Sequence, residues 1–209
     1  MVLRVIGIDI GTSLGWARIE DGRHIESGQV DLRPHSWEGV GMRAVRARQT
    51  VDAVVERARA GELGAIVVAI ELVRRHAGTQ AAQIYGAILG AVTGRCEELG
   101  VPYTFVAVQE AKLAATERGV AEKASMVAAA LQVFGVAAGE DQADAIWIAA
   151  AAGLREGDPT AAPRETPTER GKREARERAE AKRAASAAKK AAEGEAKAGK
   201  QARKRKEAA

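Results

Sequence analysis

Residues 2–30 read VLRVIGIDIGTSLGWARIEDGRHIESGQV, and this stretch decides the fold class. Its Val- and Ile-rich runs predict three strands, and Asp21-Gly22 between the second and the third is a strong signal for a two-residue hairpin. The predicted strands are 2–10, 14–20 and 24–30. The chain is therefore expected to open with an antiparallel meander.

The remainder of the first 154 residues alternates between helical and strand-like apolar patterns. We predict helices at 42–60, 80–99, 121–134 and 141–153, and strands at 65–71 and 102–108. Strands joined through a crossing helix normally lie parallel. The expected fold is an α/β mixed sheet, with an antiparallel meander followed by two parallel strands, flanked by helices.

Charge and composition divide the chain near residue 154. Residues 155–209 hold 17 Lys or Arg and 10 Asp or Glu, a net charge of +7, which leaves residues 1–154 at −3. This tail has almost no large apolar residue, so we expect it to be disordered, or helical on DNA. A basic tail favours a polyanionic partner, although a tail that only keeps the protein soluble is an equal alternative.

Cysteine usage and hydropathy indicate the compartment. Cys96 is the single cysteine, which excludes a disulfide within the chain and a cysteine-based zinc site. No apolar run approaches the length of a membrane span, and no cleavable leader is evident at the N-terminus. We expect a cytoplasmic protein.

Four acidic residues are predicted to meet at one edge of the sheet. Asp9 and Glu71 lie at or near the ends of two strands expected to be parallel, so both carboxylates emerge at the same edge. Asp141 and Asp144 share one side of the last helix, which continues with apolar residues. Gly7 lies on the face of Asp9 and is small enough for a helix to approach closely.

Four neighbouring carboxylates repel one another and need a counter-charge. Oxygen ligands select Mg²⁺ or Mn²⁺, and two such ions would activate water and stabilise the leaving oxygen of a phosphodiester. The alternative is that each acid acts separately, as a turn residue, a strand-end residue or a helix N-terminal residue.

Five segments resemble, in order, the successive motifs of the RuvC family of Holliday-junction resolvases. They are GIDIGTSLGWARIE (7–20), VVAIE (67–71), QAAQIYGAILGAV (80–92), QEAKLAATERGVAEKASM (109–126) and DQADAIWIAA (141–150). The resemblance implies a ribonuclease H-like fold, a homodimer and Mg²⁺-dependent cleavage of branched DNA in recombination and repair. It also implies that the four catalytic and metal-binding carboxylates are Asp9, Glu71, Asp141 and Asp144.

The same resemblance assigns basic residues near the scissile phosphate to Lys112 and Lys123. Further expected DNA contacts are Arg74, Arg75, Arg118, Thr12 and Ser13. Many members of the family carry an aromatic wedge after the second acid, whereas this chain has Leu72-Val73-Arg74-Arg75-His76. We interpret this departure and the basic tail as those of a phage-type or otherwise divergent member.

Two further patterns leave alternatives open. Gly86, Gly90 and Gly94 recur every fourth residue along one predicted helix, where they would permit close approach of the chain's own sheet or of a partner helix in a dimer. The three tryptophans, Trp16, Trp37 and Trp147, are assigned to the core or to surface packing rather than to base stacking.

Two other functions were weighed. A phosphotransferase of the actin and sugar-kinase type shares a GIDIGTS-like turn, but it normally needs a second phosphate loop, which the sequence does not offer. A non-catalytic junction-binding protein would have lost at least one acid, and all four are present.

Overall fold

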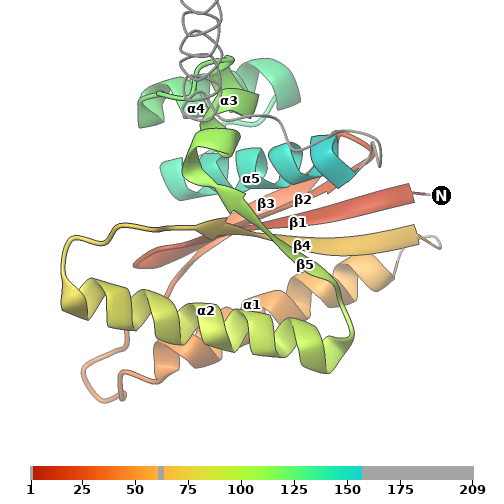
Figure 1. Ribbon diagram of the computed structural model, residues 1–209. Helices are drawn as coiled ribbons and strands as arrows, with labels where there is room; N and C mark the ends of the chain where they lie inside the picture. Colours follow the sequence, from red (N-terminus) through yellow and green to blue (C-terminus); the bar gives the residue numbers. More distant parts are fainter. Residues whose placement is uncertain (1, 61–63, 157–209) are drawn as a thin grey trace, which may run out of the picture. The chain divides into compact units, whose positions relative to one another are not determined.

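The computed structural model describes residues 2–60 and 64–156. In this part of the chain, five strands form one sheet in the order β3-β2-β1-β4-β5 (Figure 1). The strands are β1 (Val2–Ile10), β2 (Ser13–Glu20), β3 (Arg23–Asp31), β4 (Gly64–Leu72) and β5 (Tyr103–Ala107). The β1–β2 and β2–β3 pairs are antiparallel, and the β1–β4 and β4–β5 pairs are parallel, which confirms the predicted mixed sheet.

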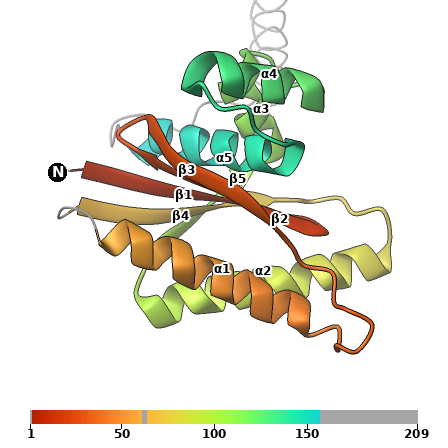
Figure 2. The same cartoon turned by 180° about the vertical axis from the view of Figure 1, so that it is seen from behind.

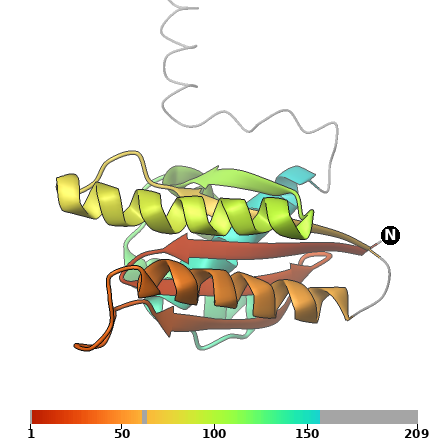
Figure 3. The ribbon, with the colours of Figure 1, turned by 90° about the horizontal axis from the view of Figure 1, so that it is seen from below.

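Helices cover both faces of this sheet. They are α1 (Met42–Arg59), α2 (Thr79–Leu99), α3 (Val108–Thr116), α4 (Lys123–Phe134) and α5 (Glu140–Glu156). Helices α1 and α2 lie side by side on one face (Figure 3), whereas α5 lies on the other face with α3 and α4 beyond it (Figures 1 and 2). Each face has its own apolar core, because the strands are buried on both sides.

The predicted hairpin is confirmed. Asp21 and Gly22 have φ angles of 45° and 78°, the left-handed conformation that this tight turn requires. Asp21 also accepts a hydrogen bond from the backbone N–H of Leu3 at 2.8 Å, which fixes the turn against β1. The turn sets the pairing of Glu20 with Arg23 and of Ile19 with His24, and the register then shifts at a bulge between Arg18 and Ile19.

One prediction is wrong at the end of β5. The strand expected at 102–108 covers only Tyr103–Ala107, and Val108 begins α3, a helix that we did not predict. The backbone N–H of Ala107 donates to the Glu110 carboxylate at 2.7 Å, so Glu110 caps the first turn. The apolar run at 102–108 concealed this start, because a short run does not distinguish a strand from the first turn of a helix.

The next helix also differs from its prediction. Helix α4 begins at Lys123 rather than at Ala121, because Glu122 is still in an extended conformation (φ −79°, ψ 153°). Residues 117–122 therefore form a loop between α3 and α4.

The last helix is longer than the predicted 141–153. Helix α5 continues to Glu156, and Arg155 donates hydrogen bonds to the Phe105 carbonyl and to the Thr104 hydroxyl of β5. The predicted behaviour of the basic tail concerns residues that, from 157 onward, lie outside the described part of the chain. Across residues 2–60 and 64–156, no helix combines the length and the apolar character needed to cross a membrane.

Two of the open alternatives are decided by burial. A Cβ atom added at Gly86, Gly90 or Gly94 would meet no atom within 4 Å, so the idea that these glycines pack against the chain's own sheet is wrong. Trp147 is buried, as expected, but the side chain of Trp37 is 80% exposed and belongs to no core. Trp37 instead packs at the surface, against the His35 ring.

Candidate active site

The ends of β1 and β4 bring the first two acids together. Ile8 and Ile70 are partners in the parallel ladder, so the residues that follow them, Asp9 and Glu71, lie at the same edge of the sheet. The charge of Glu71 is one of the causes that raise the pKa of Asp9, as expected for two neighbouring carboxyl groups. This arrangement agrees with the juxtaposition expected from the sequence.

Two glycines in the sheet allow α5 to supply the other two acids. A Cβ atom at Gly7 would collide with the Ala145 carbonyl oxygen and lie 2.7 Å from the Ala149 backbone nitrogen. A Cβ atom at Gly15 would collide with the Asp141 carbonyl oxygen. Helix α5 therefore lies with its backbone directly against β1 and β2.

Gly15 is also the antiparallel partner of Asp9. The contact of α5 with Gly15 thus sets Asp141 next to Asp9. The role of Gly7 was expected from the sequence, whereas that of Gly15 was missed. A three-residue turn between Ile10 and Leu14 sets Gly15 opposite Asp9, so the signal was present in the sequence.

All four predicted acids line one pocket of about 860 Å³. Four of the seven predicted DNA contacts line the same pocket: Thr12, Ser13, Lys112 and Lys123. Each acid is partly buried, so its carboxylate meets both the protein interior and the pocket.

The electrostatics of this pocket are dominated by negative charge. Burial, followed by the charges of Glu71, Asp144 and Asp141, raises the pKa of Asp9 to about 8. Burial is also the main cause that raises the pKa values of Glu71 and Asp144. Asp9 therefore favours its protonated form near neutral pH when no cation is bound beside it.

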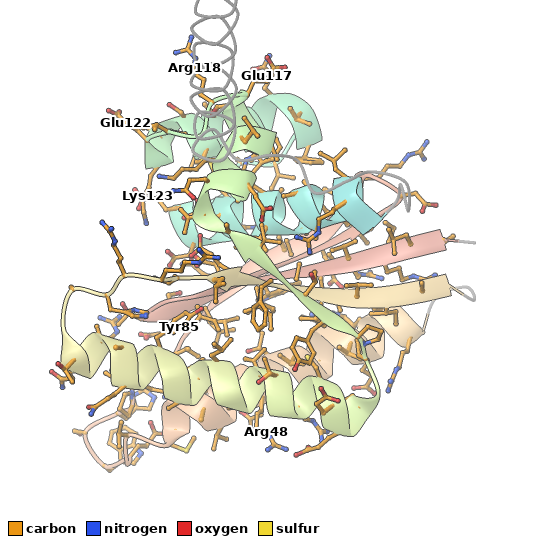
Figure 4. The ribbon with its side chains drawn as sticks, viewed as in Figure 1. Arg48, Tyr85, Glu117, Arg118, Glu122 and Lys123 are labelled. Carbon is orange, nitrogen blue, oxygen red and sulfur yellow. The ribbon has the colours of Figure 1, made fainter. Side chains whose placement is uncertain are left out.

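The two lysines offset this deficit only in part. Lys112 and Lys123 act to lower the pKa values of Glu71 and Asp144, but burial prevails. Lys123 (labelled in Figure 4) is itself engaged, because its Nζ lies 3.1 Å from the Glu140 carboxylate, which raises the pKa of the lysine. Some of the charge of Lys123 is thus already matched by an exposed acid.

The chemistry of the donors fits a divalent cation. Besides Asp31, which is paired with Arg33, the pocket offers four carboxylates from three elements. These hard oxygen ligands are the type that Mg²⁺ and Mn²⁺ select. A dication would also relieve the repulsion that raises the Asp9 pKa. Within residues 2–60 and 64–156, however, no three His, Cys, Asp or Glu side chains are already placed as ligands around one ion.

Solved structures with the same arrangement of elements include junction resolvases. RuvC of Thermus thermophilus shares 27% identity at a TM-score of 0.58, covering 75% of this chain and 97% of that one. The same protein in complex with a Holliday junction substrate gives 25% identity and a TM-score of 0.60, covering 75% of this chain and 96% of that one. The chain has a RuvC-like fold.

The other comparisons add little to this result. The yeast mitochondrial Holliday junction resolvase shares 15% identity at a TM-score of 0.47, over 73% of this chain and 80% of that one. No family model and no curated protein sequence matches the chain.

Three predicted DNA contacts lie outside the pocket of the RuvC-like fold. Arg74 and Arg75 are exposed in the loop between β4 and α2. Arg118 is exposed between α3 and α4, and it lies farther from the sheet than Lys123 (Figure 4). None of the three lines the pocket, so any contact with DNA would fall beyond its rim.

Tyr85 of α2 was not among the predicted site residues. Its hydroxyl donates to the Glu71 carbonyl at 2.7 Å and accepts from the Val73 backbone N–H at 3.2 Å. Its ring contacts that of His76, with the centroids 4.8 Å apart. Tyr85 therefore fixes the end of β4 from the side of the sheet opposite α5.

The end of β3 contributes to the pocket wall and was also missed. Gln29, Asp31 and Arg33 line the pocket. Arg33 binds both Asp31 oxygens, at 3.0 and 2.8 Å, and these hydrogen bonds lower the pKa of Asp31 to about 2. Asp31 is the partner of Ser13, so the meander itself brings this pair to the edge of the sheet where Asp9 lies.

Proposed function

We propose that this protein is a metal-dependent endonuclease that cuts phosphodiester bonds in four-way Holliday junctions and other branched DNA. The observation that carries the proposal is the pocket in which Asp9, Glu71, Asp141 and Asp144 meet in a RuvC-like fold. A related structure was solved in complex with a Holliday junction substrate, which supports this class of DNA. We assign the enzyme to the cytoplasm and to DNA recombination and repair.

The four acids are the proposed holders of two Mg²⁺ ions, for which Mn²⁺ would substitute. When bound, these cations supply an activated water and stabilise the leaving oxygen of the phosphodiester. The fit rests on the donor chemistry and on the burial and neighbouring negative charges that raise the pKa of Asp9 to about 8. Binding would draw the carboxylates closer together than they lie in the structure.

The chain's own residues position the DNA. Lys112 and Lys123 line the pocket and would attract the scissile phosphate, while the hydroxyls of Thr12 and Ser13 would contact the same strand. The exposed Arg74, Arg75 and Arg118 would hold phosphates farther along the DNA arms. The basic tail, with its net charge of +7, would add salt-sensitive affinity that does not depend on DNA shape.

We further propose that the protein acts as a homodimer. A four-way junction offers two symmetry-related strands, and two active sites related by a two-fold axis match them. The exposed Gly86, Gly90 and Gly94 on α2 leave room for the backbone of a second copy.

A nuclease assay tests the proposal. Purified protein is incubated with four-way, three-way and linear DNA of the same sequence, in Mg²⁺, in Ca²⁺ and in excess chelator. We expect paired cuts in the four-way junction with Mg²⁺, binding without efficient cutting in Ca²⁺, and no cutting with chelator. Junction binding without any cutting in Mg²⁺ or Mn²⁺ would identify a non-catalytic junction-binding protein instead.

A further inference from the structure

Trp37 presents an indole ring to solvent in the loop 32–41 between β3 and α1. Its side chain is 80% exposed, which is unusual for tryptophan. The ring lies flat against the His35 imidazole, with centroids 4.8 Å apart and an angle of 11° between the planes. The two rings form a stacked pair at the surface, which we call the Trp37–His35 pair.

The loop that carries this pair is held by a polar network. Both Glu38 oxygens accept from the Arg46 guanidinium, at 2.6 and 2.9 Å, and the same guanidinium donates to the Arg33 carbonyl at 2.8 Å. The Glu38 carboxylate also accepts from the His35 backbone N–H at 2.7 Å. These bonds cross-link both sides of Trp37 to α1, so the Trp37–His35 pair is already ordered before any ligand arrives.

The loop begins at the rim of the acid pocket. Arg33 lines the pocket, and Trp37 follows four residues later, which limits their Cα separation to about 14 Å. Figures 1 and 2 show this loop at the same end of the molecule as the loop between β4 and α2. At about 3.4 Å per base step, Trp37 lies within roughly four steps of DNA bound across the pocket rim.

We propose that the Trp37–His35 pair stacks on the last base pair of a DNA arm at the branch point. This inference rests on the proposed function and names the feature of branched DNA that the protein recognises. Within a continuous duplex, every base is covered by its neighbours, whereas a base pair at a branch point presents a free aromatic face wherever its arm is not stacked on another arm. An exposed, preformed indole matches that face without reading its sequence.

The Trp37–His35 pair therefore increases the affinity for branched DNA over that for linear duplex. Stacking on an aromatic side chain adds affinity only where a base face is free. Phosphate contacts by Lys and Arg act on duplex and junction alike. Removal of the indole should weaken binding to junctions and leave binding to linear duplex unchanged.

The test uses full-length protein in Ca²⁺, with a four-way junction that carries 2-aminopurine next to the branch point and a linear duplex that carries it internally. With wild-type protein, we expect the fluorescence of the junction probe to fall on binding. Trp37→Ala should abolish this fall and weaken junction binding by about 5- to 150-fold, with duplex affinity unchanged. Trp37→Phe should restore most of both signals.

Val40→Ala is the matched control, because Val40 is 70% exposed in the same loop and carries no aromatic ring. It should match the wild-type protein in both measurements. Trp37→Ala protein that keeps the fluorescence change and the junction preference would overturn the stacking proposal while the proposed nuclease function stands. An equal loss of junction and duplex affinity would also overturn it. If wild-type protein binds the junction no better than the duplex, this result would contradict both the proposed function and the stacking proposal.

Discussion

The two faces of the sheet use small residues in opposite ways. On the α5 face, Gly7 and Gly15 lie in the strands, and the backbone of α5 packs directly against them. On the other face, Gly86, Gly90 and Gly94 lie in α2, point away from the sheet and meet nothing within 4 Å. The first arrangement builds a site within one chain. The second leaves an exposed surface that only another molecule could cover.

The comparison predicts that chemistry belongs to the α5 face. Asp141→Asn and Asp144→Asn on α5, like Asp9→Asn and Glu71→Gln in the strands, should each lower the rate of junction cleavage by about 100- to 1,000-fold. Binding to the junction should persist or tighten, because negative charge is removed from a surface that faces DNA. The measurement is single-turnover cleavage in Mg²⁺.

Glu56→Gln provides the control for the acid variants. Glu56 is exposed on α1 and lies outside the pocket, so the same loss of charge should leave the cleavage rate unchanged. If any one of the four acid variants cuts as fast as this control, that residue does not belong to the site.

A glycine-to-alanine substitution should change the free energy of unfolding in opposite directions on the two faces of the sheet. Gly15→Ala places a methyl group against the Asp141 backbone and should destabilise the fold by about 1–3 kcal/mol. Gly90→Ala meets open space on α2 and should stabilise the fold by about 1 kcal/mol through its helix propensity. Chemical denaturation at low protein concentration measures both, and effects of the same sign would break the comparison.

A larger side chain tests what lies opposite the glycines of α2. Gly90→Leu should leave the fold intact, because the space around Gly90 is open within the chain, but it should turn dimers into monomers. Sedimentation measures the change in mass, and the far-ultraviolet circular dichroism spectrum should stay unchanged. If dimers persist in this variant, the dimer interface does not include these glycines.

The smallest effect on the cleavage rate is expected for Tyr85, the α2 residue that contacts the end of β4. Tyr85→Phe removes the hydroxyl that donates to the Glu71 carbonyl, a bond worth about 1 kcal/mol. The cleavage rate should therefore fall about fivefold, with junction affinity unchanged. A loss as large as that of the acid variants would show that α2 contributes to catalysis as strongly as α5 does.

The sequence predicted those parts of the structure that depend on local patterns. The Asp21-Gly22 turn sets the meander, and the apolar strands that end in Asp9 and Glu71 set the edge where the acids meet. Tyr85 was missed because its role arises from a contact with Glu71 on another element. Arg33 was missed because it reaches the pocket through the pairing of β2 with β3, in which its partner Asp31 lies opposite Ser13. Helix α3 was missed because its first turn continues the apolar run of β5.

The exposure of Trp37 was unpredictable for a related reason. Tryptophan is usually packed, but here the ion pair between Arg46 and Glu38 connects the loop to α1, and Trp37 on that loop is exposed. No periodicity in the sequence reports such a pair, because the two residues lie in a loop and in a helix that follows it.

The central claim is that four acids from three elements form one cation site. Binding of Mn²⁺, followed by electron paramagnetic resonance in wild-type protein and in the four acid variants, tests it without relying on cleavage. The account predicts that wild-type protein binds Mn²⁺ and that each of Asp9→Asn, Glu71→Gln, Asp141→Asn and Asp144→Asn weakens this binding at least about tenfold, whereas Glu56→Gln does not. Mn²⁺ binding that is absent in the wild-type protein, or unchanged in all four variants, would contradict it.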